Sequence, residues 1–215
     1  MFVSDHSSAA WNGDTAFSAN LAGDSGGAVF AKSDSEISFG GRTAFHGNLA
    51  AMESGIADER GMLWSGGGVA VLNFTLTLSG ETIFADNQAL GDGGAVYAFA
   101  ATALITGRSS FINNSGGRWG GAVACIDSDV VVDGNTTFGT TFSANSAGDS
   151  GGAVVAALDS NISFIGRTAF HDNLAAMGGG IADEPVMLWS GGGVAVVNST
   201  LTLSCLLYTS DAADE

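Results

Sequence analysis

The sequence predicts an all-β chain, folded as a right-handed, single-stranded parallel β-helix of roughly seven coils. Three observations predict this fold: a six-fold repeat of constant spacing, short stretches in which apolar and polar residues alternate, and 33 glycines with one proline among 215 residues. Alternation with a period of two is typical of strands that bury one face. No stretch shows the sustained 3.6-residue apolar period of a helix.

Each repeat places an asparagine three residues after a phenylalanine, and a small residue six residues after the asparagine. The six copies are Phe17-Asn20-Gly26, Phe45-Asn48-Ser54, Phe84-Asn87-Gly93, Phe111-Asn114-Gly120, Phe142-Asn145-Gly151 and Phe170-Asn173-Gly179. Successive phenylalanines are 28, 39, 27, 31 and 28 residues apart, the length of one solenoid coil. We therefore expect these residues to be structural, forming columns along the axis in which asparagine side chains hydrogen-bond from coil to coil.

Upstream of the phenylalanine, two apolar residues, a glycine and a Thr or Ser occupy alternate positions. The copies are residues 37–45, 76–84, 103–111, 130–138 and 162–170. This pattern predicts a strand, a bend at the glycine where a side chain would clash, and a second strand. The Gly-Gly-Ala-Val stretches that follow the asparagine predict a tight corner and a third strand. A single coil buries too little apolar surface to fold alone, so the coils must stack.

The sequence also contains a longer duplication, which spans several copies of the short repeat. Residues 15–79 and 140–204 align without a gap at an offset of 125, with 51 of 65 positions identical. The similarity stops after Ser204, and residues 205–215 carry no repeat signal and resemble translated adapter sequence. We therefore expect one parallel β-helix segment over residues 1–204, cut from a longer protein, and a disordered tail over residues 205–215.

Charge and composition exclude several classes of partner. Six basic and 22 acidic residues give a formal net charge of −16, which argues against binding to nucleic acid or to an anionic membrane surface. No apolar run reaches the roughly 18–20 residues of a spanning helix, so we expect no membrane insertion by this segment. The nine-residue period of calcium-binding repeats is absent, and we expect no metal site and no cofactor.

Two enzyme classes can be compared with these patterns: serine proteases and polysaccharide-cleaving enzymes. The string Gly23-Asp24-Ser25-Gly26-Gly27 matches the nucleophile region of trypsin-like proteases, but it occupies an ordinary glycine corner and nothing supplies an oriented base. Parallel β-helices also include pectate lyases and polygalacturonases, whose chemistry needs converging carboxylates or a base beside a cation. No predicted strand carries such a cluster, so we expect no catalytic residue here. The alternative is a carbohydrate-active β-helix whose active coils are unrecognised or lie outside this sequence.

Extra residues interrupt the repeat at 56–64 and again at 181–189. Each insertion ends in Met-Leu-Trp, so the candidate binding loops consist of Met62, Leu63, Trp64, Met187, Leu188 and Trp189. In one interpretation, these loops are exposed and form a bivalent contact on one face, about 20 Å apart if four coils intervene. In the other, the leucine and tryptophan fold back and cover an edge of the solenoid.

The motif pair Phe-x-x-Asn and Gly-Gly-Ala-[Ile/Leu/Val] resembles the passenger repeats of the chlamydial polymorphic membrane proteins. The Gly-Gly-Ala-Val copies lie at 26–29, 93–96, 120–123 and 151–154, and the resemblance covers nearly all of residues 9–204. Those proteins are autotransported surface β-helices associated with adhesion. The resemblance implies an extracellular or cell-surface location, associated with the outer membrane if the source is bacterial. It also implies a non-catalytic role as adhesin or structural scaffold, with a protein or glycan ligand at a cell surface.

Overall fold

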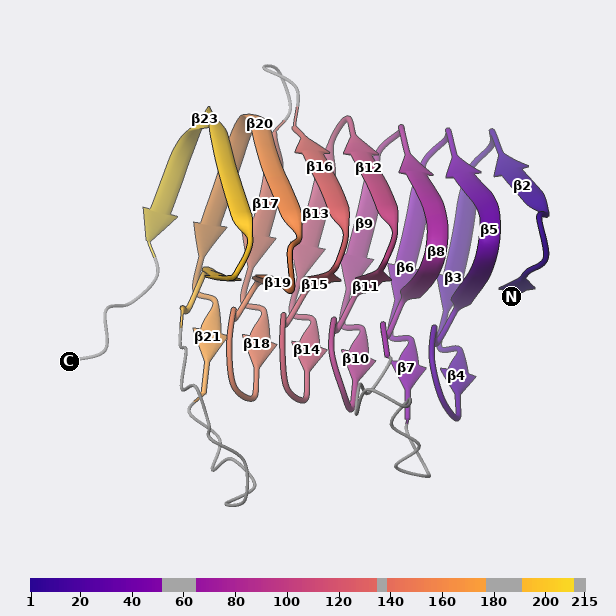
Figure 1. Cartoon of the computed structure of the whole chain (residues 1–215), viewed down its shortest axis with the longest axis horizontal. Coiled ribbons are helices and arrows are strands. Elements are labelled where there is room, and N and C mark those ends of the chain that lie inside the picture. Colours follow the sequence, from indigo (N-terminus) through magenta and orange to yellow (C-terminus); the bar gives the residue numbers. More distant parts are fainter. Residues whose placement is uncertain (52–64, 135–138, 177–190, 211–215) are drawn as a thin grey trace.

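The computed structural model describes residues 1–51, 65–134, 139–176 and 191–210 (Figure 1). The regular structure of these residues consists of 23 β-strands and contains no helix, and every pairing between strands is parallel. The strands stack as a β-solenoid of about six turns, close to the roughly seven coils expected. The predicted all-β parallel solenoid is therefore confirmed.

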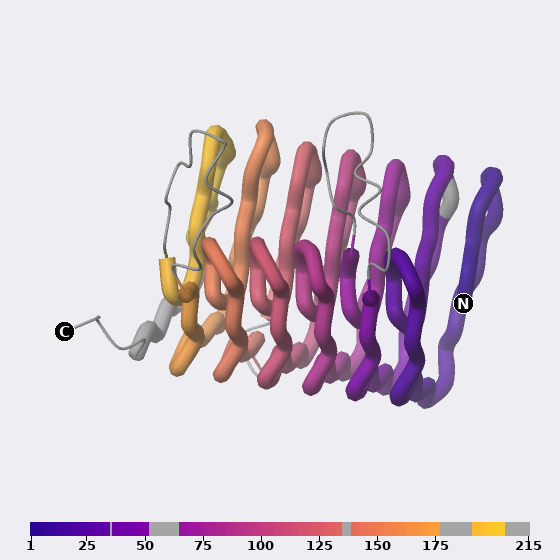
Figure 2. Tube along the Cα trace, turned by 90° about the horizontal axis from the view of Figure 1, so that it is seen from below, coloured from indigo at the N-terminus to yellow at the C-terminus, as the bar shows by residue number. Residues whose placement is uncertain are grey.

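Each turn passes through four runs of backbone, which lie over one another from coil to coil (Figure 2). The first run contains β1 (Phe2–Val3), the start of β5 (Val29–Phe39), the start of β8 (Val69–Leu78), β11 (Val96–Phe99), β15 (Val123–Ile126), β19 (Val154–Ala157) and β22 (Val194–Val197). The second contains β2 (Ser8–Trp11), the ends of β5 and β8, β12 (Thr102–Thr106), β16 (Asp129–Asp133), and the starts of β20 (Asn161–His171) and β23 (Thr200–Ser210).

The third run contains β3 (Thr15–Ser18), β6 (Thr43–His46), β9 (Thr82–Ala85), β13 (Ser109–Ile112), β17 (Thr140–Ser143) and the ends of β20 and β23. The fourth run is a separate six-stranded sheet of β4 (Leu21–Ala22), β7 (Leu49–Ala50), β10 (Gln88–Ala89), β14 (Ser115–Gly116), β18 (Ser146–Ala147) and β21 (Leu174–Ala175). The alternating pattern and the glycines predict the strands of the second, third and first runs with the bend and the corner between them, but not the two-residue strands of the fourth run.

The coils stack in constant register, so equivalent residues lie directly over one another. In the third run, Phe111 pairs with Phe84 on one side and with Phe142 on the other. Inward-pointing Val, Ile, Leu and Phe side chains from the first three runs form one continuous core along the axis. The period-two pattern thus places its apolar residues inside, together with the Thr or Ser that follows the glycine bend.

Glycine is required where neighbouring coils approach at the corner after the fourth run. A Cβ atom on Gly94 would lie 2.1 Å from the carbonyl oxygen of Gly121 in the next coil. The preceding Gly93 has a φ of +66°, which side-chain-bearing residues rarely adopt. The Gly-Gly pair is therefore needed both for the turn and for the close approach of the coils.

The last described residues of the chain lie in strand β23. Strand β23 continues through Ser210, and its residues 205–210 pair in parallel with residues 166–171 of β20. The pairing uses backbone groups that β20 offers along its whole length, so it does not require the side chains of the repeat. Residues 211–215 lie outside the described part of the chain.

Candidate functional site

The six repeat phenylalanines form one stack along the axis. Ring centroids are 5.0, 4.6, 5.0, 4.7 and 4.8 Å apart in the order Phe17, Phe45, Phe84, Phe111, Phe142 and Phe170, with interplanar angles of 4° to 7°. These centroid distances lie within the range of favourable aromatic pairs. All but the half-buried Phe17, at the first coil, are buried, so the stack belongs to the core and offers no surface to a ligand.

The six repeat asparagines, Asn20, Asn48, Asn87, Asn114, Asn145 and Asn173, form a second column. Within it, Asn114 shows the pattern: its Nδ2 donates to Asn145 Oδ1 at 3.0 Å and to the carbonyl oxygen of Phe84 at 3.0 Å. Its own Oδ1 accepts from the side-chain and backbone nitrogens of Asn87. The amide is thereby fully hydrogen-bonded, which accounts for its burial without any ligand.

The candidate binding loops cannot be placed in this architecture. Met62, Leu63 and Trp64 lie outside the described residues, and so do Met187, Leu188 and Trp189. Both interpretations of these loops therefore remain predictions.

Two columns of mostly polar residues lie along the corner between the first and second runs. The corner residue has a positive φ in successive coils, at Asp34, Asn73, Ala100, Asp127, Asp159 and Asn198. Asn and Asp are the non-glycine residues that adopt this conformation most readily, which explains their frequency at the corner. Two residues further on, a second exposed column consists of Glu36, Thr75, Thr102, Asp129, Asn161 and Thr200. We call these two columns the corner groove.

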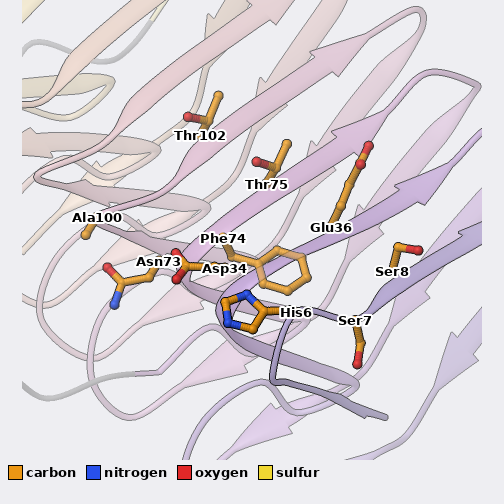
Figure 3. Close-up of a pocket in the computed structure, with 10 residues that line it drawn as sticks. All are labelled: His6, Ser7, Ser8, Asp34, Glu36, Asn73, Phe74, Thr75, Ala100 and Thr102. Atoms are coloured by element: carbon orange, nitrogen blue, oxygen red, sulfur yellow. The ribbon is translucent and has the colours of Figure 1, made fainter.

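The corner groove deepens into a hollow of about 510 Å³ near the first coils (Figure 3). Its lining consists of His6, Ser7, Ser8, Asp34, Glu36, Asn73, Phe74, Thr75, Ala100 and Thr102. Phe74 is 4% exposed, so hydroxyl, amide, carboxylate and imidazole groups make up most of the accessible surface. The hollow can therefore hydrogen-bond a polar ligand but offers little apolar area.

A second hollow of about 360 Å³ repeats the first at the other end of the solenoid. It is lined by Asp159, Ser160, Asn161, Asn198, Ser199 and Thr200, which correspond to residues 34–36 and 73–75 at the offset of 125. The duplication has thus produced two copies of one surface feature. Between the copies, Glu36 is replaced by Asn161 and Phe74 by Ser199.

The two hollows differ in how far their side chains are already hydrogen-bonded. In the second, Asn198 Nδ2 donates to Asp159 Oδ1 at 2.9 Å, and Asn161 Nδ2 donates to Asp129 Oδ1 at 2.8 Å. In the first, the side chains of Asp34, Glu36 and Asn73 form no hydrogen bond or ion pair with the other described residues. The first hollow therefore presents its carboxylates and amide free for a ligand.

Sequence reasoning missed the corner groove. The available signal was the recurrence of Asp or Asn two residues before the exposed Thr, Glu, Asp or Asn at the start of the second run. Ala100 interrupts that recurrence, and the hollow depends on the bend between the first and second runs. Residue spacing along the chain does not reveal this bend.

One buried ion pair departs from the repeat, at the corner after the fourth run. Arg118 donates to the fully buried Asp92 twice, from Nε to Oδ1 at 2.9 Å and from Nη2 to Oδ2 at 2.6 Å. The Trp119 backbone also donates to Oδ1, and the guanidinium carbon lies 4.3 Å from the Trp119 ring centroid. Burial raises the pKa of the Asp92 carboxyl, and the bonds from Arg118 offset part of this rise. The ion pair of Arg118 and Asp92 therefore connects two consecutive coils.

The described residues show no arrangement suited to nucleophilic or metal-assisted chemistry. Ser25, from the protease-like string, is buried at a glycine corner, and no histidine is hydrogen-bonded to its hydroxyl. Over residues 1–51, 65–134, 139–176 and 191–210, no three His, Cys, Asp or Glu side chains are grouped to hold a metal ion. The same residues include no helix with the length and apolarity needed to cross a membrane.

Comparison with known families identifies one part of the chain. The family model of the Chlamydia polymorphic membrane protein repeat matches residues 81–98. This stretch covers β9, β10 and the start of β11, and it includes Phe84, Asn87 and the Gly93-Gly94 corner. The chain thus carries a repeat of this kind, as the resemblance predicted, and its solenoid fits a surface-associated β-helix segment. Neither curated protein sequences nor solved structures give a match to the chain.

Proposed function

We propose that this segment is part of a non-catalytic, surface-displayed or secreted β-solenoid that acts as an adhesin or a structural scaffold. The observation that carries the proposal is the match of residues 81–98 to a surface-protein repeat, at a coil whose phenylalanine and asparagine continue the columns of the other coils. An extended rod of this kind presents side chains far from its attachment point. Its location at a cell surface, or at an outer membrane if the source is bacterial, belongs to the same proposal.

The solvent-facing side chains support presentation of a surface over catalysis. One outer column of the second run consists of Thr, Ser and Asn with two separated acids, Glu36 and Asp129. Near the bend before the third run, Glu81 lies between Arg42 at 3.1 Å and Arg108 at 3.8 Å. That cluster holds one carboxylate, whereas glycosidase chemistry needs two. Because a carboxylate beside arginines is also what a polysaccharide lyase needs, the assay on polygalacturonate described below tests this cluster.

The test is adhesion of the folded chain. Beads coated with the purified protein are passed over cultured epithelial cells, with albumin-coated beads and beads carrying Gly94→Val as controls. Valine at this position cannot be accommodated 2.1 Å from the Gly121 oxygen, so the variant separates folded presentation from non-specific attachment. An adhesin predicts at least tenfold greater retention of wild-type beads than of either control.

Two results would redirect the proposal. Retention no greater than that of albumin would contradict adhesion and leave the scaffold role, provided that the wild-type chain unfolds cooperatively. Release of new reducing ends from polygalacturonate above the no-protein background would contradict the non-catalytic role and support the carbohydrate-active alternative.

A further inference from the structure

We infer that the corner groove is a binding site for a neutral, polyhydroxylated glycan, which lies along the solenoid axis and occupies the two hollows as two subsites at corresponding positions of the duplication. This inference rests on the proposed adhesive function, because it assigns the ligand class and the surface that binds it. The site is the groove itself, built on the described strands β2, β5, β8 and β12 at one end and β20 and β23 at the other.

The hydrogen-bonding groups of the groove suit sugar hydroxyls. Asp34 and Glu36 can each accept from two hydroxyls, Asn73 can donate and accept, and Thr75 and Thr102 can do both. All five are exposed or border the hollow, and none of their side chains is joined to another described residue. A ligand therefore meets groups that rigid strands already hold in place, and it does not need to break existing bonds in the first hollow.

The same lining disfavours the other classes of ligand. Protein partners are usually anchored by aromatic or large apolar side chains, and Phe74 is 4% exposed. Anionic polymers, including nucleic acids and sulfated or uronate glycans, would meet Asp34 and Glu36 in a chain of net charge −16. Neutral glycans carry hydroxyls throughout and no charge, so the groove can satisfy them without this repulsion.

The repetition of the groove matches a repetitive ligand. Polar groups recur from coil to coil, although Ala100 interrupts one of the two columns, and neighbouring coils lie about 4.8 Å apart, which is close to the length of one pyranose unit in an extended chain. The two hollows are separated by four coils, or about 19 Å along the axis. One glycan chain can therefore reach both hollows, and its second contact forms at high effective concentration.

Binding is measured by isothermal titration of the 215-residue chain with neutral hexasaccharides of glucose, mannose, xylose and N-acetylglucosamine, and with heparin and polylysine as charged probes. The blocking variant is Thr75→Trp, in which the indole fills the first hollow from an exposed strand position. The matched control is Thr77→Trp, two residues along the same strand and outside the hollow. Thr200→Trp and Thr202→Trp form the corresponding pair at the second hollow.

We expect at least one neutral hexasaccharide to bind, with an affinity that changes less than twofold between low and high salt. Thr75→Trp or Thr200→Trp should weaken binding at least tenfold, and the two controls should leave it unchanged. If Thr75→Trp fails to fold, Glu36→Ala replaces it, because Glu36 is an exposed lining residue whose truncation leaves the core intact.

Three outcomes would overturn the inference: no binding of any neutral hexasaccharide at millimolar concentration, binding that survives both tryptophan variants, or salt-sensitive binding of heparin or polylysine alone. These results are distinguishable from failure of the proposed function. Bead adhesion that persists in Thr75→Trp with Thr200→Trp would overturn the groove assignment while leaving the adhesin. Glycan binding without bead adhesion would overturn the adhesin and leave the groove assignment in place.

Discussion

Asn87 and Asn114 are 27 residues apart in the chain, yet their side-chain amides are hydrogen-bonded to each other. Asn87 Nδ2 donates to Asn114 Oδ1 at 3.0 Å, and the Asn87 backbone nitrogen donates to the same oxygen at 3.1 Å. The second hydrogen of Asn87 Nδ2 goes to the carbonyl oxygen of Phe45. Each asparagine is thus hydrogen-bonded to the coil before it and to the coil after it. Its removal should weaken the contacts with both coils.

The first prediction concerns this column. Asn114→Ala should lower the free energy of unfolding by about 3 kcal/mol or more, because it removes the oxygen that accepts from two buried donors of Asn87, the backbone N–H and Nδ2. The measurement is equilibrium unfolding in urea. Asn20→Ala is the matched control, since Asn20 is exposed at the first coil. Its loss should cost less than about 1 kcal/mol, and equal losses at both positions would contradict the coil-to-coil account.

The second prediction concerns a column of buried hydroxyls that follows the glycine bend. Thr43, Thr82, Ser109, Thr140 and Thr168 are at most 1% exposed, and their hydroxyl oxygens have no hydrogen-bond partner within the described structure. Thr82→Val replaces an unpaired hydroxyl by a methyl group of similar size and keeps the β-branched shape. It should therefore stabilise the fold by about 1 kcal/mol.

The control for this exchange is Thr77→Val, on the half-buried outer side of the second run. Its effect on the free energy of unfolding should stay within about 0.5 kcal/mol. Destabilisation by Thr82→Val of about 1 kcal/mol or more would mean that the hydroxyl does form a hydrogen bond, and the column would then be a second polar ladder.

The columns could be predicted from the sequence because their spacing is a direct consequence of stacking. A residue that must contact its equivalent in the next coil recurs at the coil length, so Phe84 and Asn87 are recognisable as repeat positions from their spacing alone. In the copy at residues 130–138 the upstream pattern ends at Phe138, whereas the ring in the stack is that of Phe142, the phenylalanine predicted for this coil from the spacing to Asn145.

The groove and the ion pair could not be predicted in the same way. Asp34 and Asn73 share a backbone conformation, but Ala100 adopts it as well, so residue identity at the corner varies. Asp92 and Arg118 lie in different coils at non-equivalent positions of the repeat, and only the fold brings them together. Such features depend on the angle between runs and on side-chain length, neither of which is encoded in periodicity.

The third prediction uses the alkylation of Cys125 to report how often the solenoid opens around strand β15. Its thiol is fully buried, and burial raises its pKa to about 12. In a Cys205→Ser background at pH 8, alkylation by iodoacetamide should be at least about 10³-fold slower in the folded chain than in guanidinium, because thiolate forms only on opening. Mass spectrometry over time measures this ratio. Labelling of the folded chain at the unfolded rate would contradict the packing of β15.

The fourth prediction tests the ion pair of Asp92 and Arg118. Arg118→Met should destabilise the fold by about 3–5 kcal/mol at neutral pH, since it leaves the Asp92 carboxylate buried and unpaired. Asp92→Asn should cost less, because the Arg118 side chain is 28% exposed and can turn to water. The double variant Asp92→Asn with Arg118→Met should recover most of the loss caused by Arg118→Met, and a double-mutant cycle in urea measures the coupling.

The pH dependence of Arg118→Met follows from the direction of the Asp92 shift. The folded-state pKa of Asp92 lies above its ordinary value of 3.8, so folding favours the protonated form, and this contribution to stability is lost as the pH rises through the folded pKa. Without Arg118 the pKa of Asp92 rises further, so the total loss of stability becomes larger. The destabilisation by Arg118→Met should therefore be small near pH 3.5 and largest near pH 8. In the double variant, which has no carboxyl at position 92, the destabilisation should not depend on pH in this way. A pH-independent cost would show that Arg118 acts by packing on Trp119 and not through the carboxylate.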